Sequence, residues 1–234
     1  MEEIRRREFM MHGARIIGAV VGGMTLGAGM PLVRVGEASE IQFQQSSCGI
    51  NNTKAPKFLV AYASRCGSTG GVAEAMGQSL CHKGAIVDVR LITGVADLSS
   101  YEAVVVGGAI RSDQWLPEAT AFVEKNRQFL SGIPVAYFLT CLAMSQPSRE
   151  SRSEARSYLN PVITAVPEVK PVDMGLFAGA LDYGKLPFHI RMVMKLKMIS
   201  KGVSEGDYRD WKAIRGWSEG LRPKLLARTR TRPG

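Results

Sequence analysis

The feature that most constrains the fold is the alternation, from Lys57 onward, of short apolar runs with stretches of helical pattern. Such alternation is typical of a doubly wound α/β sheet of parallel strands, because each crossover helix returns the chain to start the next strand in the same direction. Three consecutive valines in Glu102–Val106 indicate a strand buried on both faces. Five strands are expected, over residues 58–63, 85–91, 102–106, 134–140 and 172–178.

Helices are expected over residues 71–82, 116–129, 148–160 and 208–227. Pro161 is expected to end the third helix, because proline lacks the N–H that a helix interior needs. In open parallel sheets, ligands bind beyond the carboxyl ends of the strands, where the strand order reverses. The loops after Ala63, Val106 and Thr140 are therefore the expected binding site.

Composition narrows the class of partner. In this chain of 234 residues, Lys and Arg exceed Asp and Glu by nine, which favours a phosphate, acidic lipid or other anion. No zinc finger or aromatic-rich basic module accompanies this charge, so nucleic acid is not the expected partner. The four cysteines form no CxxC pair and no metal-ligand spacing, so neither a metal site nor a disulfide framework is expected; they are Cys48, Cys66, Cys81 and Cys141.

Residues 1–38 are expected to be a targeting segment. Arg5-Arg6-Arg7-Glu8-Phe9-Met10 resembles a twin-arginine export signal, followed by an apolar, glycine-rich stretch and small residues suited to cleavage. An uncleaved membrane anchor is the alternative. Residues 39–56 are expected to be a linker, residues 57–227 the folded domain, and residues 228–234 a basic tail. The protein is expected to be exported, periplasmic or anchored facing outside; the alternative is the cytoplasmic face of the inner membrane.

The loop Ser64–Thr69 carries the main evidence for function. Short hydroxyl side chains and free backbone N–H groups converge there at a helix N-terminus, whose partial positive charge favours a phosphate dianion. The loop lacks the glycine spacing of a dinucleotide fingerprint and the Gly-Lys-Ser/Thr ending of a Walker A loop. In the alternative interpretation, these hydroxyls only cap the helix.

The stretch Val60–Ala73 resembles the FMN-phosphate signature of flavodoxins: an apolar strand, an aromatic residue, a hydroxyl, a small residue, a threonine, and an alanine one turn later. This resemblance implies FMN (flavin mononucleotide) as cofactor, in a flavodoxin-like five-stranded parallel sheet of order 2-1-3-4-5. It also implies which residues hold the phosphate, namely Ser64, Arg65, Cys66, Gly67, Ser68 and Thr69.

The second and third loops are expected to hold the flavin ring, through Gly107, Gly108, Ala109, Ile110, Arg111, Trp115, Thr140, Cys141 and Leu142. Paired glycines let backbone approach a flat ring, and Trp115 either stacks on that ring or packs in the core. Arg111 is the expected catalytic residue, because a cation beside the ring would stabilise its reduced, anionic form. Cys141 is expected to be a packed thiol rather than a nucleophile.

Within the flavodoxin group, the chain most resembles the menaquinone-dependent protoporphyrinogen dehydrogenases, through Gly107–Arg111, Phe177–Tyr183 and Asp207–Trp211. That group has a basic segment before its last helix, here Lys185–Lys201. A helical projection gathers its apolar residues in one arc, with Arg191 and Lys195 outside it. Such a helix suits an anionic membrane or an acidic substrate such as a porphyrin. Packing against the sheet is the alternative.

The resemblance implies an FMN-dependent oxidoreductase that transfers electrons or hydride, with protoporphyrinogen IX as donor and menaquinone as acceptor. Two alternatives stay open. One is an exported, flavodoxin-type electron carrier for protein partners, which the export signal favours. The other is a flavin-free, membrane-associated binding module.

Overall fold

The computed structural model describes residues 41–52, 54–186, 188–200 and 202–227. The expected targeting segment and basic tail lie outside these residues. The main sheet has seven strands: β1 (Ser46–Cys48), β2 (Lys57–Ala63), β3 (Ile86–Leu91), β4 (Ala103–Arg111), β5 (Gln114–Trp115), β6 (Val135–Cys141) and β7 (Met174–Ala178).

The five parallel strands follow the order β3-β2-β4-β6-β7. This is the 2-1-3-4-5 order, so the predicted flavodoxin-like fold is confirmed. Val104, Val105 and Val106 of β4 have no exposed surface, as their run of valines predicts. All five strands run the same way, so their carboxyl ends form one edge, called here the sheet edge.

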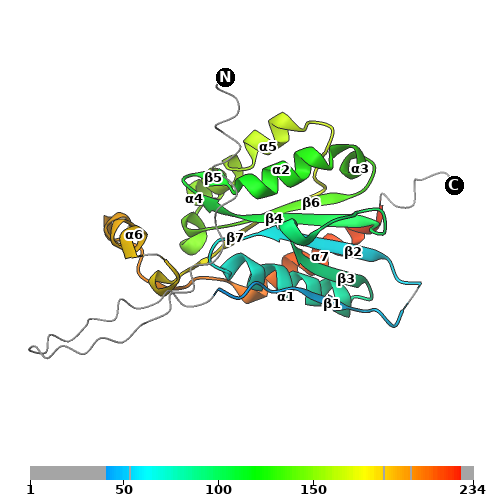
Figure 1. Cartoon of the computed structure of the whole chain (residues 1–234), viewed down its shortest axis with the longest axis horizontal. Coiled ribbons are helices and arrows are strands. Elements are labelled where there is room, and N and C mark those ends of the chain that lie inside the picture. The colour runs from blue at the N-terminus through cyan, green and yellow to red at the C-terminus, as the bar shows by residue number, and fades with distance from the viewer. Residues whose placement is uncertain (1–40, 53, 187, 201, 228–234) are drawn as a thin grey trace, which may run out of the picture. The chain divides into compact units, whose positions relative to one another are not determined.

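Helices cover both faces of the sheet (Figure 1). On one face, α1 (Ser68–His82) and α7 (Trp211–Ala227) lie in contact and bury Met76, Leu80 and Ile214. On the other face, a second apolar cluster joins the sheet to four helices: α2 (Pro117–Lys125), α3 (Arg127–Ser131), α4 (Arg149–Ser157) and α5 (Asn160–Ala165). The core therefore forms two layers, one on each face of the sheet.

Part of the predicted linker belongs to the fold, which corrects the prediction for residues 39–56. Residues 46–48 form β1, which pairs antiparallel with β3 and is the outermost strand on that side of the sheet. Ser47 Oγ donates a hydrogen bond to Asp88 Oδ1 at 2.5 Å, and the Tyr62 hydroxyl donates to the Gln44 carbonyl at 2.7 Å. Polar residues can form this outermost strand because the strand is held by backbone hydrogen bonds, which do not require apolar side chains.

The helices also differ from the prediction in two places. The helix expected over residues 116–129 is divided into α2 and α3 at Asn126. Pro161, expected to end a helix, instead lies in the first turn of α5. A proline is tolerated there because the first N–H groups of a helix have no partner within the helix.

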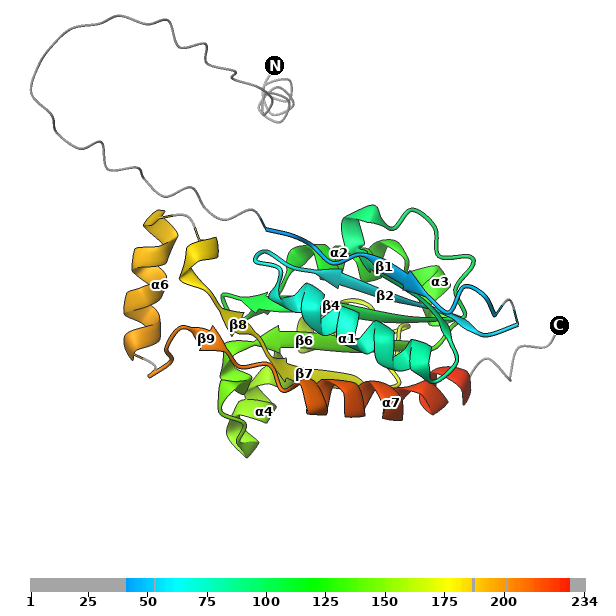
Figure 2. The same cartoon turned by 90° about the horizontal axis from the view of Figure 1, so that it is seen from below.

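Between β7 and α7 the chain leaves the sheet to form a small unit, residues 180–207, called here the insert (Figure 2). Strands β8 (Ala180–Leu181) and β9 (Gly206–Asp207) pair at its base, and η4 (Tyr183–Lys185) leads to α6 (Phe188–Ser200). The basic helical insert predicted before the last helix is therefore present. Among the described residues, no helix has both the length and the apolar character needed to cross a bilayer.

Candidate functional site

The phosphate loop, Ser64–Gly67, connects β2 to the N-terminus of α1. Gly67 adopts a left-handed φ of 81° as the N-cap, which few residues other than glycine tolerate. Its N–H donates to Ser64 Oγ at 3.0 Å, which fixes the turn. In the described part of the chain, no side chain caps α1, and its first turn has no acidic residue. The positive end of the helix is therefore available to an anion.

Arg209 adds a positive charge at this helix end, although the sequence analysis did not identify it. Its Nη1 donates to the Ser68 carbonyl at 3.2 Å, while Asp207 accepts bonds from Nε at 2.7 Å and Nη2 at 2.6 Å. A Cβ on Gly71 would lie 2.6 Å from Arg209 Nη1, so the glycine leaves room for the guanidinium. Arg209 lies within Asp207–Trp211, one of the segments that resemble the family, and this resemblance was the only indication of Arg209 in the sequence.

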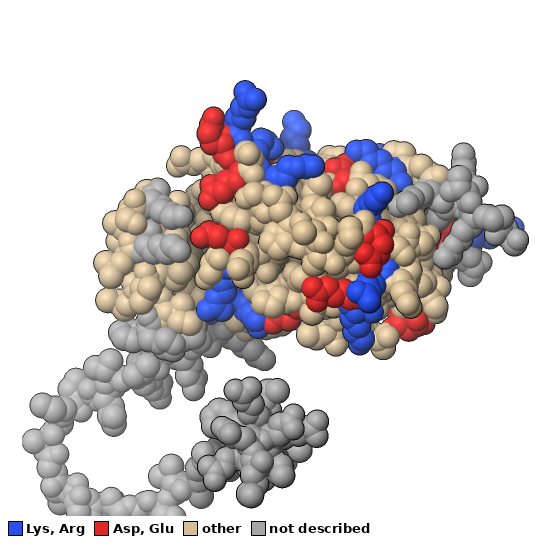
Figure 3. All heavy atoms as spheres, turned by 90° about the horizontal axis from the view of Figure 1, so that it is seen from above, with Lys and Arg blue, Asp and Glu red and all other residues tan. Residues whose placement is uncertain are grey.

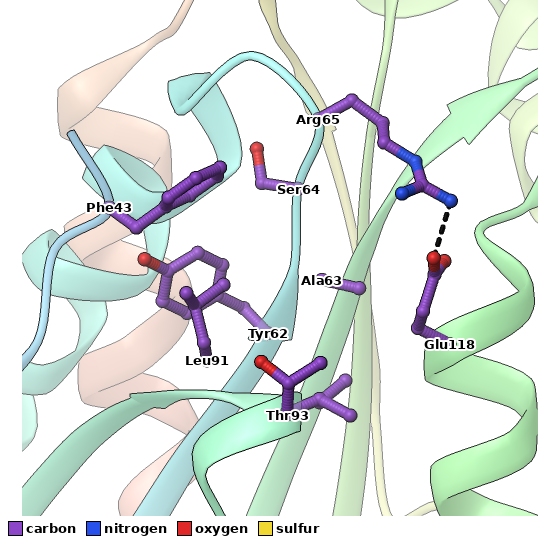
Figure 4. Close-up of a pocket in the computed structure, with 9 residues that line it drawn as sticks. Phe43, Tyr62, Ala63, Ser64, Arg65, Leu91, Thr93 and Glu118 are labelled. Atoms are coloured by element: carbon purple, nitrogen blue, oxygen red, sulfur yellow. Dashed lines mark hydrogen bonds and ion pairs between the residues drawn. The ribbon is translucent and has the colours of Figure 1, made fainter. Parts of the chain in front are cut away.

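Arg65 lies in the loop, but its side chain turns toward α2 and forms an ion pair with Glu118 (Figure 4). Beneath this pair lies a cavity of about 170 Å³ with apolar walls from Phe43, Tyr62 and Leu91. Sites that enclose drug-sized ligands measure about 300–1,000 Å³, so this cavity does not enclose a flavin ring.

Thr69 connects the first and third loops from inside the protein. It is fully buried, and its Oγ1 lies 2.8 Å from Thr140 Oγ1 at the end of β6. A Cβ on Gly179, which follows β7, would lie 3.9 Å from Ser68 Oγ and 3.8 Å from Thr140 Cβ. The ends of β2, β6 and β7 therefore meet around the start of α1.

The segment predicted as the second loop is mostly strand, which corrects that expectation. Strand β4 continues to Arg111, and a two-residue turn, Ser112-Asp113, leads into β5. Both turn residues have left-handed φ, 52° and 60°, as two-residue hairpins of this type require. Arg111 is exposed at the tip of the hairpin.

The paired glycines are explained by packing inside the sheet layers. A Cβ on Gly107 would lie 1.9 Å from Phe138 Cε1, and one on Gly108 would lie 2.7 Å from Trp115 Nε1. Trp115 is only 4% exposed and lies against Tyr137, with ring centroids 5.5 Å apart. Trp115 therefore packs in the core, which was one of its two predicted roles. Ala109 and Ile110 are partly buried against the same cluster.

Three parts of the chain approach one another around Cys66 of the phosphate loop. Burial raises the pKa of the Cys66 thiol, while the positive charges of Lys185 and Arg111 act in the opposite direction. Both cations therefore lie within electrostatic range of the loop, one from the insert and one from the hairpin. Arg111, the predicted catalytic cation, thus acts electrostatically on the Cys66 thiol, and Asp182 of the insert acts on the same thiol with the opposite sign.

The third loop joins the sheet edge to the insert. Cys141 is buried, and burial raises its thiol pKa to about 11, as expected for a packed thiol rather than a nucleophile. Leu142 begins η3 (Leu142–Ser145) and packs against an apolar cluster in the insert, formed by Leu181, Tyr183 and Met198.

Helix α6 has two different apolar faces. Met198 is buried and Met194 partly buried on the insert's own cluster. The opposite face leaves large apolar side chains exposed, at Met192 (52%), Val193 (66%), Leu196 (68%) and Ile199 (71%). These four residues belong to the arc that the helical projection gathered. On the face that Figure 3 shows, the atoms at the α6 end that are not grey are mostly tan, that is, neither Lys, Arg, Asp nor Glu.

The residues of the phosphate loop fit the terminal phosphate of FMN. Residues 41–44 pass beside this turn, since a Cβ on Gly67 would lie 3.1 Å from the Gln42 carbonyl oxygen and one on Gly70 would lie 2.2 Å from Gln44 Oε1. The helix N-terminus and nearby cations supply the charge that a dianion needs. Among the described residues, no group of three or more His, Cys, Asp or Glu could hold a metal ion.

Comparison with known proteins agrees with this geometry. Residues 59–207 match a family model described as a flavodoxin domain, which covers more than half of the chain. The chain is 26% identical over 169 residues to the protoporphyrinogen IX dehydrogenase [quinone] of Escherichia coli K12, covering 68% of this chain and 90% of that protein. It is 26% identical over 187 residues to the Leishmania major protein of the same name, covering 75% and 78%.

Solved structures similar to the chain include a flavodoxin from the domain Archaea, at 16% identity and a TM-score of 0.42, covering 73% of this chain and 99% of that one. The family model, the strand order and the phosphate loop lead to the same assignment. The chain belongs to the flavodoxin domain family and is a flavodoxin-like oxidoreductase whose cofactor is FMN.

Proposed function

We propose that the chain is an FMN-dependent, quinone-linked dehydrogenase that oxidises a porphyrinogen, with protoporphyrinogen IX and menaquinone as the candidate pair. The observation that carries this proposal is the exposed apolar face of α6, attached through Leu142 and Tyr183 to the sheet edge that would hold the flavin. A lipid-soluble quinone is reached at a membrane surface, and an apolar face beside the cofactor provides such a contact. The names of the two relatives support protoporphyrinogen IX as donor and a quinone as acceptor.

FMN supplies the redox chemistry, because it accepts two electrons from a donor and passes them to an acceptor. The protein's own residues bind and orient it. The N-terminus of α1 would hold the phosphate, with Arg209 beside it. Arg111 would place positive charge near the loop, which favours negative charge on the ring and would also attract the carboxylates of a porphyrinogen, whereas Lys185 is paired with Asp182 at 3.7 Å.

Turnover by the purified protein tests the reaction. Under anaerobic conditions, the FMN-loaded protein should oxidise protoporphyrinogen IX only when a menaquinone is supplied, with one quinone reduced for each pair of electrons removed. If porphyrinogen and menaquinone give no turnover, while the bound flavin reduces a protein acceptor, the chain is an electron carrier and the dehydrogenase proposal is wrong.

Flotation with anionic vesicles tests the membrane surface separately. Leu196→Glu should weaken vesicle binding about tenfold, because a charge would enter the apolar contact. Ile50→Glu is the matched control, since Ile50 is exposed to nearly the same extent, 66% against 68%, but lies far along the chain from α6. Equal vesicle binding by the two variants would refute membrane contact through α6.

We also propose that residues 1–38 direct export by the twin-arginine route. The support is the Arg5-Arg6-Arg7 sequence and the apolar stretch that follows it. Replacing Arg5, Arg6 and Arg7 together by lysine should retain the protein in the cytoplasmic fraction of its host. An unchanged distribution between fractions would contradict the proposal.

A further inference from the structure

Two cysteines that lie far apart in the sequence meet where β1 contacts α1. Cys48 ends β1 and lies opposite Val87 of β3. Its Sγ lies 3.9 Å from the carbonyl oxygen of Gly77 in α1. Cys81 lies four residues after Gly77, hence one turn later on the same face of the helix. The two thiols therefore lie side by side, although nothing in their spacing predicts it.

The backbone on both sides of this contact is closely packed. A Cβ on Gly77 would lie 2.4 Å from Val89 Cγ2, so the glycine lets α1 approach β3 directly. Gly49 follows Cys48 with a left-handed φ of 75°, and a Cβ there would lie 2.4 Å from the Ala85 carbonyl oxygen. These two approaches hold Cys48 and Cys81 in fixed relative positions.

The surroundings of the two thiols suit a disulfide. Both are partly exposed, whereas Cys141 is buried. Burial, together with the neighbouring Cys81 side chain, raises the pKa of Cys48 to about 12. The raised pKa disfavours the Cys48 thiolate, so in thiol–disulfide exchange Cys81 is the thiol that starts the reaction and Cys48 is the one that completes the bond.

We propose that Cys48 and Cys81 form a reversible disulfide that attaches the N-terminal segment, residues 41–48, to α1. The oxidant is an external disulfide, either a small molecule or a protein. One cysteine, deprotonated, attacks a sulfur of that disulfide, and one external thiol leaves. The second cysteine then attacks the mixed disulfide and releases the other external thiol. Two protein thiols lose two electrons and two protons, and the external disulfide is reduced to two thiols.

The disulfide would act on the side of the protein that holds the phosphate. Residues 41–48 pass along the start of α1: the Gln42 carbonyl lies beside Gly67, and a Cβ on Gly70 would lie 2.2 Å from Gln44 Oε1. Fixing Cys48 to α1 therefore keeps this segment across the first turn of the helix. The inference does not depend on the identity of the electron donor or acceptor.

Peptide mapping tests the proposal on the full-length protein. The protein is equilibrated with oxidised glutathione, alkylated, and cleaved after Lys, Arg and Glu, which separates Cys66 from Cys81 because Glu74 lies between them. Residues 41–54 and 75–83 should appear as one linked species, about 2 Da lighter than the sum of the two free peptides. The unfolding temperature should rise by several degrees and return to its starting value on reduction.

Variants distinguish this pair from the other cysteines. Cys48→Ser and Cys81→Ser should each abolish both the linked species and the rise in unfolding temperature, whereas Cys66→Ser should keep both. The proposal is overturned if both peptides are recovered alkylated, if each carries glutathione instead, or if Cys48 is linked to Cys66.

Discussion

The sheet edge and the insert adjoin each other but are stabilised in opposite ways. At the sheet edge, Thr69 and Thr140 share a buried hydrogen bond, and Gly67 is fixed in a left-handed turn. In the insert, α6 rests on a small apolar cluster and leaves one whole apolar face exposed.

The difference indicates that the sheet edge stabilises the fold, whereas the exposed face of α6 is available to contact a partner or a membrane. Burial of apolar surface contributes about 25 cal/mol per Å², so the exposed face of α6 can contribute only when a partner or membrane covers it. The sheet edge gains its stability within the chain. Changes at the sheet edge should therefore alter folding and FMN affinity, while changes on the exposed face of α6 should alter only the contact with the partner.

Gly107→Ala should have the largest effect and tests directly whether the sheet is stabilised by close packing within the chain. Its Cβ would lie 1.9 Å from Phe138 Cε1, so the free energy of unfolding should fall by about 3 kcal/mol in urea titrations. Gly216→Ala in α7 is the control, because its Cβ would meet no described atom within 4 Å; it should stabilise the protein by about 0.5–1 kcal/mol. Equal unfolding midpoints would show that the sheet is not tightly packed there.

Thr69→Val tests whether the Thr69 hydroxyl binds the phosphate in addition to its bond with Thr140. It should lower the free energy of unfolding by ~1–3 kcal/mol, because it leaves the buried Thr140 hydroxyl unpaired. Thr140→Val removes the same bond from the other side. If Thr69→Val weakens FMN binding more than Thr140→Val does, measured by quenching of flavin fluorescence, Thr69 contacts the cofactor. Vesicle binding that changed with either variant would argue against separate roles for the two regions.

Arg209→Gln should weaken FMN binding about tenfold, with a smaller difference at high salt, because it removes a cation beside the start of α1. Arg65→Gln is the control. Both arginines are ion-paired, Arg65 with Glu118 and Arg209 with Asp207, but only Arg209 also donates to the Ser68 carbonyl in the first turn of α1, so loss of Arg65 should change FMN affinity less. A larger effect from Arg65 would mean that its side chain leaves Glu118 to bind the phosphate.

The smallest effect is expected from replacing Asp88 of β3, the strand that pairs with β1, and it concerns how stability depends on pH. Burial opposes ionisation, but hydrogen bonds from Ser47, Tyr101 and Lys57 outweigh it and hold the pKa of Asp88 below its ordinary value. A lowered pKa contributes stability that is complete above the unfolded value, about 3.9, and is lost as the pH falls through the folded value. Asp88→Asn should therefore flatten the acid side of the stability curve measured by urea unfolding. An unchanged acid slope would contradict this.

The sequence by itself determined the five parallel strands and the phosphate loop, because these depend on local patterns, and the resemblance to flavodoxins supplied the strand order. A run of valines specifies a buried strand wherever it lies, and a hydroxyl-rich turn before a helix forms an anion site from its own backbone. The apolar arc of α6 was likewise visible in a helical projection, whereas its exposure was decided by the tertiary structure. The functions of Arg111 and the phosphate-loop side chains remain predictions.

Only the tertiary structure decided which distant residues meet. Arg209 binds the Ser68 carbonyl from 141 residues away, and Cys48 meets Cys81 through an edge strand within the predicted linker. Trp115 became a core residue because Gly108 leaves space for its ring. Such contacts depend on how strands pair and how closely a helix approaches the sheet. These distances are set by the packing of the whole domain, and no short stretch of sequence records them.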